Sequence, residues 1–470
     1  MIVGPRRGGT VSDFSAEIDA VLGSLKQAAI DAYMRVEMNS EEMLKGEIWD
    51  DSYRWVHAQT YQVIVERPRN GVGGGYCTIE IMGRPEVGDD QYLARFAEIR
   101  ATIDSVVDPW RSLPDPSKLQ SVMDTATEVA SILAPDGADG GGGVGLQASI
   151  AEIERHLGSM TGQTIAAFKQ NFLGVLDSVV TNLYLLPINA GAGMAGEQGA
   201  LQQAREDFIS VLNQSTARFN EVAKMGGSPG RLLFTLVKSA NSMIGNFLPA
   251  PAKVVSSSVG VVLGLIDELG LVEADEPAAS AADYEAAMSA FQDSVKKLNG
   301  SLRDIESELT DKLREINLTT VSSYQQFDLR IPKAEPHSDE YSVTKIDEDA
   351  VDDIVNVYLP DIASFLSTAA NRSNAMRIDD ELDRDASIGS GGVGSKWEIN
   401  AVCSRLESLL RELAWEVEFA QDQLRLIRDL FVQNDEAGRD ALYQHERQLD
   451  YQHHPYDPRG KQPMGGYSIQ

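Results

Sequence analysis

Residues 284–316 carry an apolar side chain at nearly every third or fourth position, and this stripe constrains the fold more than any other feature. Such spacing is typical of a long helix that packs in a seam against another helix. We expect this helix over 279–318, because Gly300 costs only about 1 kcal/mol there. We expect its partner helix within 150–180 or 201–222 of the same chain. The core of the seam is Phe291, Val295, Leu298, Leu302, Ile305 and Leu309.

Other stretches show the same helical period, and one shows the period of a strand. Apolar stripes cover 14–36, 201–222, 351–369 and 397–431, which predicts long amphipathic helices. Residues 61–66 and 76–82 instead alternate β-branched and polar side chains around a glycine-rich connection, which predicts a β-hairpin at 61–82. The predicted fold is therefore mainly α, an elongated bundle of long amphipathic helices with one small β-hairpin.

Glycine- and proline-rich stretches divide the chain into predicted units. Gly191–Gly199 is expected to interrupt one helical stripe, and Trp49–Trp55 is expected to be a break between elements. The predicted units are a helical unit with the hairpin (1–134), a glycine-rich linker (135–145), a helical bundle (146–330), a second linker (331–344), a two-helix hairpin (345–450) and a disordered tail (451–470).

The charge of the chain restricts its partners. It has 41 basic and 71 acidic side chains, a net charge of −30, which excludes nucleic acid as a partner because binding a phosphate backbone needs Lys and Arg. The same charge disfavours adsorption on anionic lipid. The first residues lack the apolar run of a secretory signal, so we expect no cleaved signal peptide.

No spacing in the sequence is typical of a catalytic or metal site. Gly389–Gly394 fits G-x-G-x-x-G, but an acid-rich helical segment precedes it where a phosphate loop needs a strand, so we interpret these as linker glycines. His445, His453 and His454 cluster in the predicted tail, which offers no rigid frame for a metal. Cys77 and Cys403 are interpreted as buried apolar residues. We expect no enzymatic activity, no metal and no cofactor.

The segment 232–272 is apolar on nearly all sides. From Ser239 to Ile266 the only charged side chain is Lys253, and Pro249 and Pro251 interrupt any single membrane span. The favoured interpretation is a buried helical hairpin inside the bundle, and the alternative is a membrane-inserting segment. The candidate inserting residues are Val259, Val261, Val262, Leu263, Leu265 and Ile266.

Residues 345–450, about a fifth of the chain, resemble the Trp-x-Gly helical-hairpin family of type VII secretion substrates. Lys396-Trp397-Glu398 opens the second predicted helix, and Phe431-Val-Gln-Asn-Asp435 lies near its end. Ile399 stands where that family has glycine, and Phe431 where its export signal has tyrosine. The resemblance implies a bacterial protein that is exported folded and pairs through helix faces. It also implies that the secretion ATPase reads Trp397, Phe431 and Asp435.

Three functional hypotheses follow. The favoured one is a non-enzymatic helical interaction protein that binds a protein partner through helix faces, as a secreted or cell-surface type VII-like substrate. Its location would be cytoplasmic if the resemblance is coincidental. The first alternative is a membrane-inserting toxin or pore-former that uses 232–272. The second is a phage or virion structural component.

Overall fold

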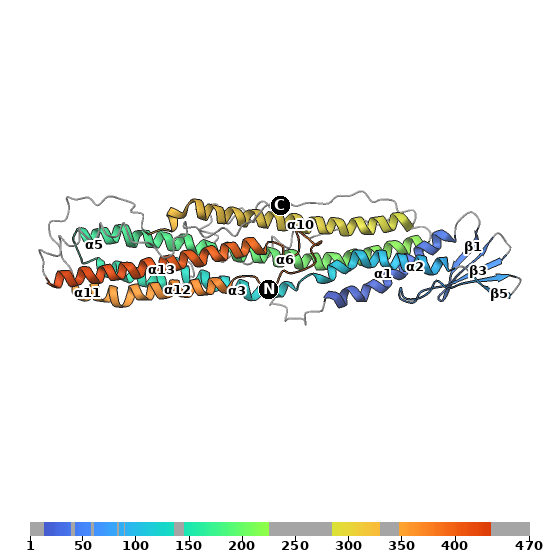
Figure 1. Ribbon diagram of the computed structural model, residues 1–470, viewed down its shortest axis with the longest axis horizontal. Coiled ribbons are helices and arrows are strands. Elements are labelled where there is room, and N and C mark those ends of the chain that lie inside the picture. The colour runs from blue at the N-terminus through green and yellow to red at the C-terminus, as the bar shows by residue number, and fades with distance from the viewer. Residues whose placement is uncertain are drawn as a thin grey trace, which may run out of the picture.

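A computed structural model describes residues 14–38, 43–57, 61–81, 84–88, 90–135, 145–224, 284–329 and 347–433. They form an elongated bundle of helices with a small sheet at one end (Figure 1). This arrangement confirms the predicted fold class. Most of the linker 135–145, the apolar segment 232–272, the linker 331–344 and the tail 451–470 lie outside the described residues.

The central helix of the bundle is α6, Gly174–Lys224. Its 51 residues span about 76 Å at 1.5 Å per residue. Four other helices pack against it: α1 (Phe14–Glu37), α3 (Gln120–Leu133), α10 (Tyr284–Ser322) and α13 (Lys396–Gln433). Every residue from 183 to 201 is buried, as expected for a helix with neighbours on all sides.

The glycines of 191–199 do not interrupt α6, so the predicted break was wrong. This stretch lies inside the fully buried part of the helix. A Cβ at Gly193 would lie 3.1 Å from the Leu313 side chain of α10, so the missing side chain allows α10 to approach closely. Tertiary packing thus offsets the low helix propensity of glycine.

This close approach predicts opposite effects at two glycines. Gly193→Val adds volume against Leu313 and should destabilise the protein by about 1–3 kcal/mol. Gly300→Ala is the control, because a Cβ there meets no atom within 4 Å, and it should stabilise α10 by up to about 1 kcal/mol. Urea unfolding followed by circular dichroism measures both changes, and equal effects at the two positions would contradict this explanation.

The stripe on α10 packs as predicted. All six seam residues, Phe291 to Leu309, are buried, and α10 packs chiefly on α6. At one end of the seam the rings of Phe219 and Tyr284 lie 6.1 Å apart. The seam is therefore intramolecular, and its partner includes the predicted range 201–222.

Apart from α2 (Gln91–Val107), the remaining helices lie in the half of the rod far from the sheet (Figure 1). The antiparallel pair α12 and α13 packs against α3, α4 and α6, so side chains from all three predicted units belong to one hydrophobic cluster. Short 3₁₀ or π segments occupy Asp108–Ser112, Pro116–Leu119, Phe168–Leu173, Tyr324–Phe327 and Ile354–Tyr358. The other helices are α2 (Gln91–Val107), α4 (Leu146–Leu157), α5 (Gln163–Ala167), α11 (Glu348–Asp353) and α12 (Leu359–Ala375).

The sheet has five antiparallel strands in sequential order. They are β1 (Met43–Ile48), β2 (Ser52–His57), β3 (Tyr61–Glu66), β4 (Cys77–Ile81) and β5 (Arg84–Val87). The pairing of β3 with β4, with Val63 opposite Ile79, confirms the predicted hairpin. The expected break at Trp49–Trp55 is instead a tight turn followed by β2.

Candidate functional site

One face of the sheet packs on the ends of α1 and α2. The Tyr53 ring lies 6.1 Å from the Phe96 ring, and the Trp55 ring lies 5.8 Å from the Tyr92 ring, both in edge-on geometry. Tyr53 and Trp55 alternate with half-exposed or exposed residues along β2. Since successive side chains of a strand point to opposite faces of the sheet, one face packs on the helices and the other faces outward.

A buried carboxylate anchors the sheet to α1. Asp31 accepts hydrogen bonds from Tyr53 Oη at 2.6 Å and from Arg67 Nε at 2.9 Å, and Arg67 Nη2 pairs with its second oxygen at 2.5 Å. Gln27 also donates to Asp31, at 2.9 Å. Burial, followed by the neighbouring Asp31 charge, raises the pKa of Tyr53, so the phenol remains a proton donor.

Removing this carboxylate should loosen the sheet. Asp31→Asn leaves Arg67 without its counter-charge, and we expect a loss of about 3 kcal/mol in unfolding free energy. Asp19→Asn is the matched control, because Asp19 is 63% exposed in its pair with Arg111, and such pairs contribute at most about 1 kcal/mol. Urea titration followed by tryptophan fluorescence compares the two, since Trp49 and Trp55 report on this end. Equal losses would contradict the anchoring role of Asp31.

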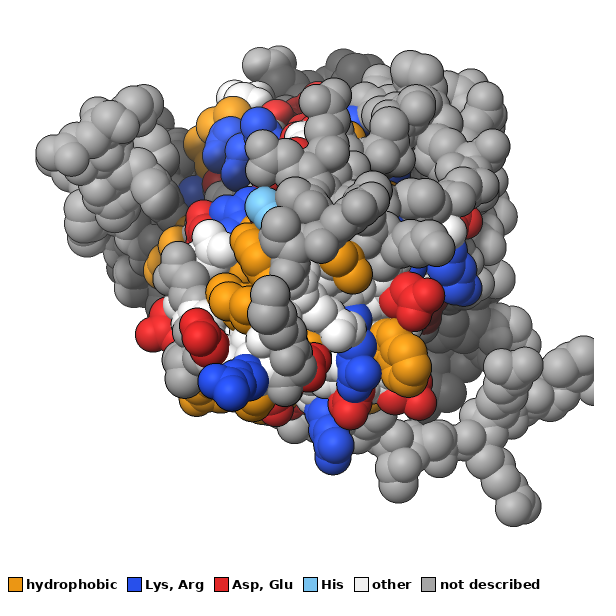
Figure 2. Space-filling view, turned by 90° about the vertical axis from the view of Figure 1, so that its right-hand side faces the viewer, with side chains coloured by type: hydrophobic (Ala, Val, Ile, Leu, Met, Phe, Trp, Pro, Cys, Tyr) orange, Lys and Arg blue, Asp and Glu red, His pale blue; other side chains and the backbone are white. Residues whose placement is uncertain are grey.

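The outer surface of this end carries most of the exposed large hydrophobic side chains of the described residues. Six of the ten come from residues 36–81. Over 36–90, which spans these six side chains and all five strands, the sequence has five basic and eleven acidic residues, so this end is acidic like the rest of the chain. Figure 2, which views this end of the rod, shows hydrophobic side chains among side chains of both charges. We call Val36, Trp49, Val56, Val72, Tyr76 and Ile81 the tip surface.

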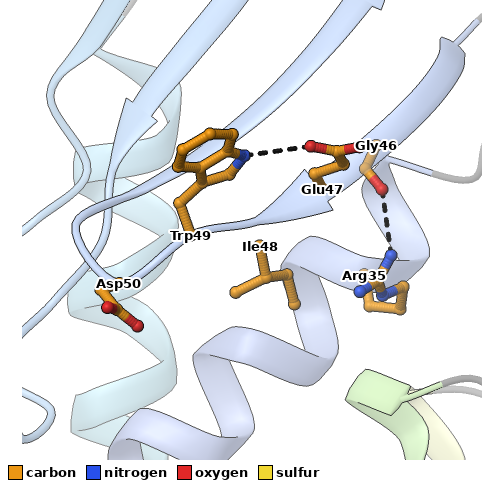
Figure 3. A pocket seen from close by; sticks show the side chains of 6 residues that line it. All are labelled: Arg35, Gly46, Glu47, Ile48, Trp49 and Asp50. Carbon is orange, nitrogen blue, oxygen red and sulfur yellow. Dashed lines mark hydrogen bonds between the residues drawn. The ribbon is translucent and has the colours of Figure 1, made fainter.

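A pocket of about 550 Å³ opens beside the tip surface, between α1 and the β1–β2 turn (Figure 3). Arg35 and Glu47 on its wall already bond to the protein. Arg35 Nη1 donates to the Gly46 carbonyl at 3.1 Å, and Trp49 Nε1 donates to Glu47 at 3.2 Å. Arg54 lies 4.6 Å from the centre of the Trp49 ring. These bonds fix the rim of the pocket and hold Trp49 in place.

The end of α6 and the start of α10 both lie beside the tip surface. Arg35 Nε donates to the carbonyl of Ala223, in the last turn of α6, at 2.7 Å. The ring of Tyr33 lies 5.6 Å from that of Tyr284, the first residue of α10. The segment 225–283 therefore begins and ends at the sheet-bearing end of the rod.

A second polar site lies in the bundle, where the connection 376–395 between α12 and α13 meets two buried carboxylates. Glu197 of α6 and Glu306 of α10 are both 0% exposed. Arg384 forms an ion pair with Glu306, and the Ser390 amide and hydroxyl donate to Glu306 at 2.6 and 2.9 Å. The Ser395 amide donates to Glu197 at 2.7 Å. We call these five residues the carboxylate cluster.

The glycines of the G-x-G-x-x-G sequence lie in the connection between α12 and α13, and two of them also make this cluster possible. Gly389 and Gly394 have φ values of 64° and 54°, which favour glycine. A Cβ at Gly394 would lie 2.9 Å from Glu197 Oε1. Burial and the nearby Glu197 charge raise the pKa of Glu306 to about 7, although Arg384 and Ser390 act in the opposite direction.

The residues singled out by the type VII resemblance do not meet. Trp397 lies in the first turn of α13 and is 53% exposed. Phe431 lies in the last turn, about 51 Å away along the helix. The Phe431 side chain and Asp435 lie outside the described residues, as do the inserting candidates Val259, Val261, Val262, Leu263, Leu265 and Ile266.

The described residues bear on two further kinds of site, a metal site and a membrane-spanning helix. They contain no group of three or more His, Cys, Asp or Glu that could hold a metal ion. One helical stretch among them, Ile165–Lys224, is long and apolar enough to cross a membrane, but 61% of its most apolar window is buried inside the bundle. Burial in the bundle accounts for the composition of this stretch.

Comparison with known proteins gives no match. No protein-family model, curated protein or solved structure is similar to the chain. The resemblance of 345–450 to type VII substrates stays a prediction, and function is inferred from the residues and geometry of this chain.

Proposed function

We propose that the protein is a non-enzymatic helical interaction protein that contacts a lipid membrane with the sheet-bearing end of the rod. The observation that carries this proposal is that the segment 225–283 begins and ends beside the tip surface. The two points at which the segment with the least charged stretch of the sequence joins the bundle thus lie at the same end as most of the exposed hydrophobic side chains.

The sequence of the segment favours lipid as the partner. Residues 225–266 contain three basic and no acidic residues, in a chain with 71 acidic side chains. One pass through a bilayer takes roughly 20 apolar residues, and each basic residue near an anionic lipid surface contributes about 1 kcal/mol of attraction. The apolar length and the basic residues of 225–266 both fit an anionic membrane as the partner.

The distribution of charge determines how the rod approaches. The net charge of −30 repels the body of the rod from anionic lipid. Residues 225–266 carry three basic and no acidic side chains, so this stretch is the part of the chain that an anionic surface attracts. Because the stretch is joined to the bundle beside the tip surface, we expect the rod to contact the membrane end-on.

Vesicle flotation tests this proposal with the full chain. The protein is mixed with phosphatidylcholine vesicles, or with vesicles that also contain phosphatidylglycerol, at pH 5 and pH 7.5. We expect the protein to float with both, and more strongly with the anionic vesicles at low salt. Absence from the floating fraction under every condition would overturn the proposal.

A second candidate function, a type VII-like export substrate, is favoured by the exposure of Trp397 and by the pairing of α12 with α13. Phe431→Ala and Asp435→Ala are each expected to abolish export without changing the circular dichroism spectrum. Asp422→Ala is the control, because that side chain is 70% exposed on the same helix. Normal export of the first two variants would rule out this function and leave the membrane proposal untouched.

A further inference from the structure

The pocket between α1 and the β1–β2 turn presents opposite charges on its two sides. Ile48 lies between Arg35 on one side and Asp50 on the other (Figure 3). The volume of about 550 Å³ is within the range of small-molecule sites, roughly 300–1,000 Å³, in which a few placed polar groups orient the ligand. The pocket therefore suits a small ligand that carries both a positive and a negative group.

Both charged side chains can bind such a ligand. Arg35 donates through Nε to the Ala223 carbonyl at 2.7 Å and through Nη1 to the Gly46 carbonyl at 3.1 Å. These bonds fix the guanidinium and leave its Nη2 group without an acceptor among the described residues. Asp50 is exposed, and its carboxylate forms no hydrogen bond or ion pair within the described part of the chain.

The balance of charge in the pocket excludes simple anions. Glu47 adds a second carboxylate to the wall, where it accepts a hydrogen bond from Trp49 Nε1 at 3.2 Å. The lining thus carries two carboxylates and one guanidinium, and it repels a ligand of net negative charge such as inorganic phosphate. A ligand with an ammonium group for Asp50 and a phosphate for Arg35 satisfies both sides.

The aromatic surroundings indicate which kind of ammonium group fits. Quaternary ammonium groups are recognised by cages of several aromatic rings. Among the described residues that line the pocket, Trp49 is the single aromatic one, and Arg54 lies 4.6 Å from the centre of its ring. A primary ammonium group instead donates hydrogen bonds directly to a carboxylate, so the pocket favours a primary ammonium.

We propose that this pocket binds the phosphoethanolamine headgroup of a membrane lipid, with the ammonium group at Asp50 and the phosphate at Arg35. Trp49 is 49% exposed on the rim, and tryptophan is enriched at the level of the lipid headgroups. Contact of the tip surface with a bilayer therefore places the pocket at headgroup level. This inference rests on the proposed membrane contact and names the lipid that this end of the rod selects.

Flotation with two kinds of uncharged vesicle tests the selection. One kind contains phosphatidylcholine alone, and the other also contains phosphatidylethanolamine. We expect the full chain to partition about three- to fivefold more strongly to the second kind. Asp50→Asn should abolish this preference and leave binding to phosphatidylcholine unchanged. Glu86→Gln is the control, because Glu86 is exposed on β5 of the same sheet and does not line the pocket, and it should keep the preference.

The sign of the effect separates a specific contact from a general effect of charge. Removal of any acidic side chain weakens repulsion from anionic lipid, so both variants should bind phosphatidylglycerol vesicles at least as well as the unmodified protein. Loss of the contact with the ammonium group lowers binding to phosphatidylethanolamine alone. A preference for phosphatidylethanolamine that survives in Asp50→Asn would overturn the proposal.

A soluble headgroup tests the pocket without a membrane. In saturation-transfer NMR titrations, we expect glycerophosphoethanolamine to bind the full chain about three- to fivefold more tightly than glycerophosphocholine, and Asp50→Asn to remove this difference. Equal binding of the two compounds, or equal flotation with the two uncharged vesicles, would overturn the headgroup site and leave the membrane contact intact. Selective binding of glycerophosphoethanolamine by a protein that floats with no vesicle would support the pocket and overturn the membrane contact.

Discussion

Replacing both Val261 and Val262 by aspartate is expected to abolish vesicle leakage by the protein. Each aspartate at the centre of a membrane-spanning helix costs about 2.5–3.5 kcal/mol. Two together reduce insertion by more than about a thousandfold. Release of a trapped dye from anionic vesicles measures the effect, and the unmodified protein should cause release under the conditions in which it floats with vesicles.

A control at the other end of the rod isolates the role of the segment. Val357→Asp makes the same chemical change at a side chain that is 45% exposed and far from the tip, and it should leave leakage unchanged.

Thermal unfolding of the double variant separates the two interpretations of 232–272. Lost leakage with unchanged stability supports insertion. A stability loss of several kcal/mol would instead show that Val261 and Val262 belong to a buried hairpin.

Arg384→Met is expected to destabilise the protein by about 3–5 kcal/mol, because it removes the buried counter-charge of the carboxylate cluster. Methionine has a similar length and no charge, so the change leaves little cavity. Arg372→Met is the matched control, since Arg372 is 48% exposed in its pair with Glu128 and should cost at most about 1 kcal/mol.

The loss at Arg384 should depend on pH. The pKa of Glu306 is raised to about 7 by burial and by the Glu197 charge, and a protonated Glu306 needs no counter-charge, so the loss should be smaller at pH 5 than at pH 8, where Glu306 is ionised. Urea unfolding at the two pH values measures this difference. A loss no larger than that of Arg372→Met at pH 8 would contradict the buried ion pair.

The regular helices could be predicted because their burial follows the helical period. The stripe from Tyr284 to Ile316 on α10 is buried against α6. The apolar positions in the sequence therefore identify the face of α10 that is packed. The same rule failed at Gly191–Gly199, because a central helix has no exposed face and its sequence there reflects how closely its neighbours approach. Single-sequence propensity cannot supply that information.

The strands outside the predicted hairpin could not be identified for a related reason. In β1 the run Lys45-Gly-Glu47 breaks the alternation that identifies a half-buried strand, and β1 is an edge strand with an irregular register near Leu44. Pairing with β2 stabilises it there. Edge strands are specified by their neighbours more than by their own pattern.

The carboxylate cluster depends on contacts between distant parts of the chain. Arg384 is 78 residues from Glu306, and Ser395 is 198 residues from Glu197. One feature of the sequence indicated a buried polar site: Glu197 is an isolated acidic residue within a run of small and apolar residues. Such an acid has to be buried with a partner, but its partner could not be identified without the fold.

The end-on contact of the rod with a membrane is the central claim, and site-specific fluorescence tests it most directly. A polarity-sensitive dye is attached to Val72→Cys on the tip surface or to Val357→Cys at the far end, in a chain with Cys77→Ser and Cys403→Ala. Val72 and Val357 are 73% and 45% exposed, so both dyes start in water. With anionic vesicles, we expect the emission of the dye at position 72 to shift to the blue and to be quenched by nitroxide-labelled lipid, while the dye at 357 stays unchanged. Equal responses at the two ends, or a response at 357 alone, would contradict the claim.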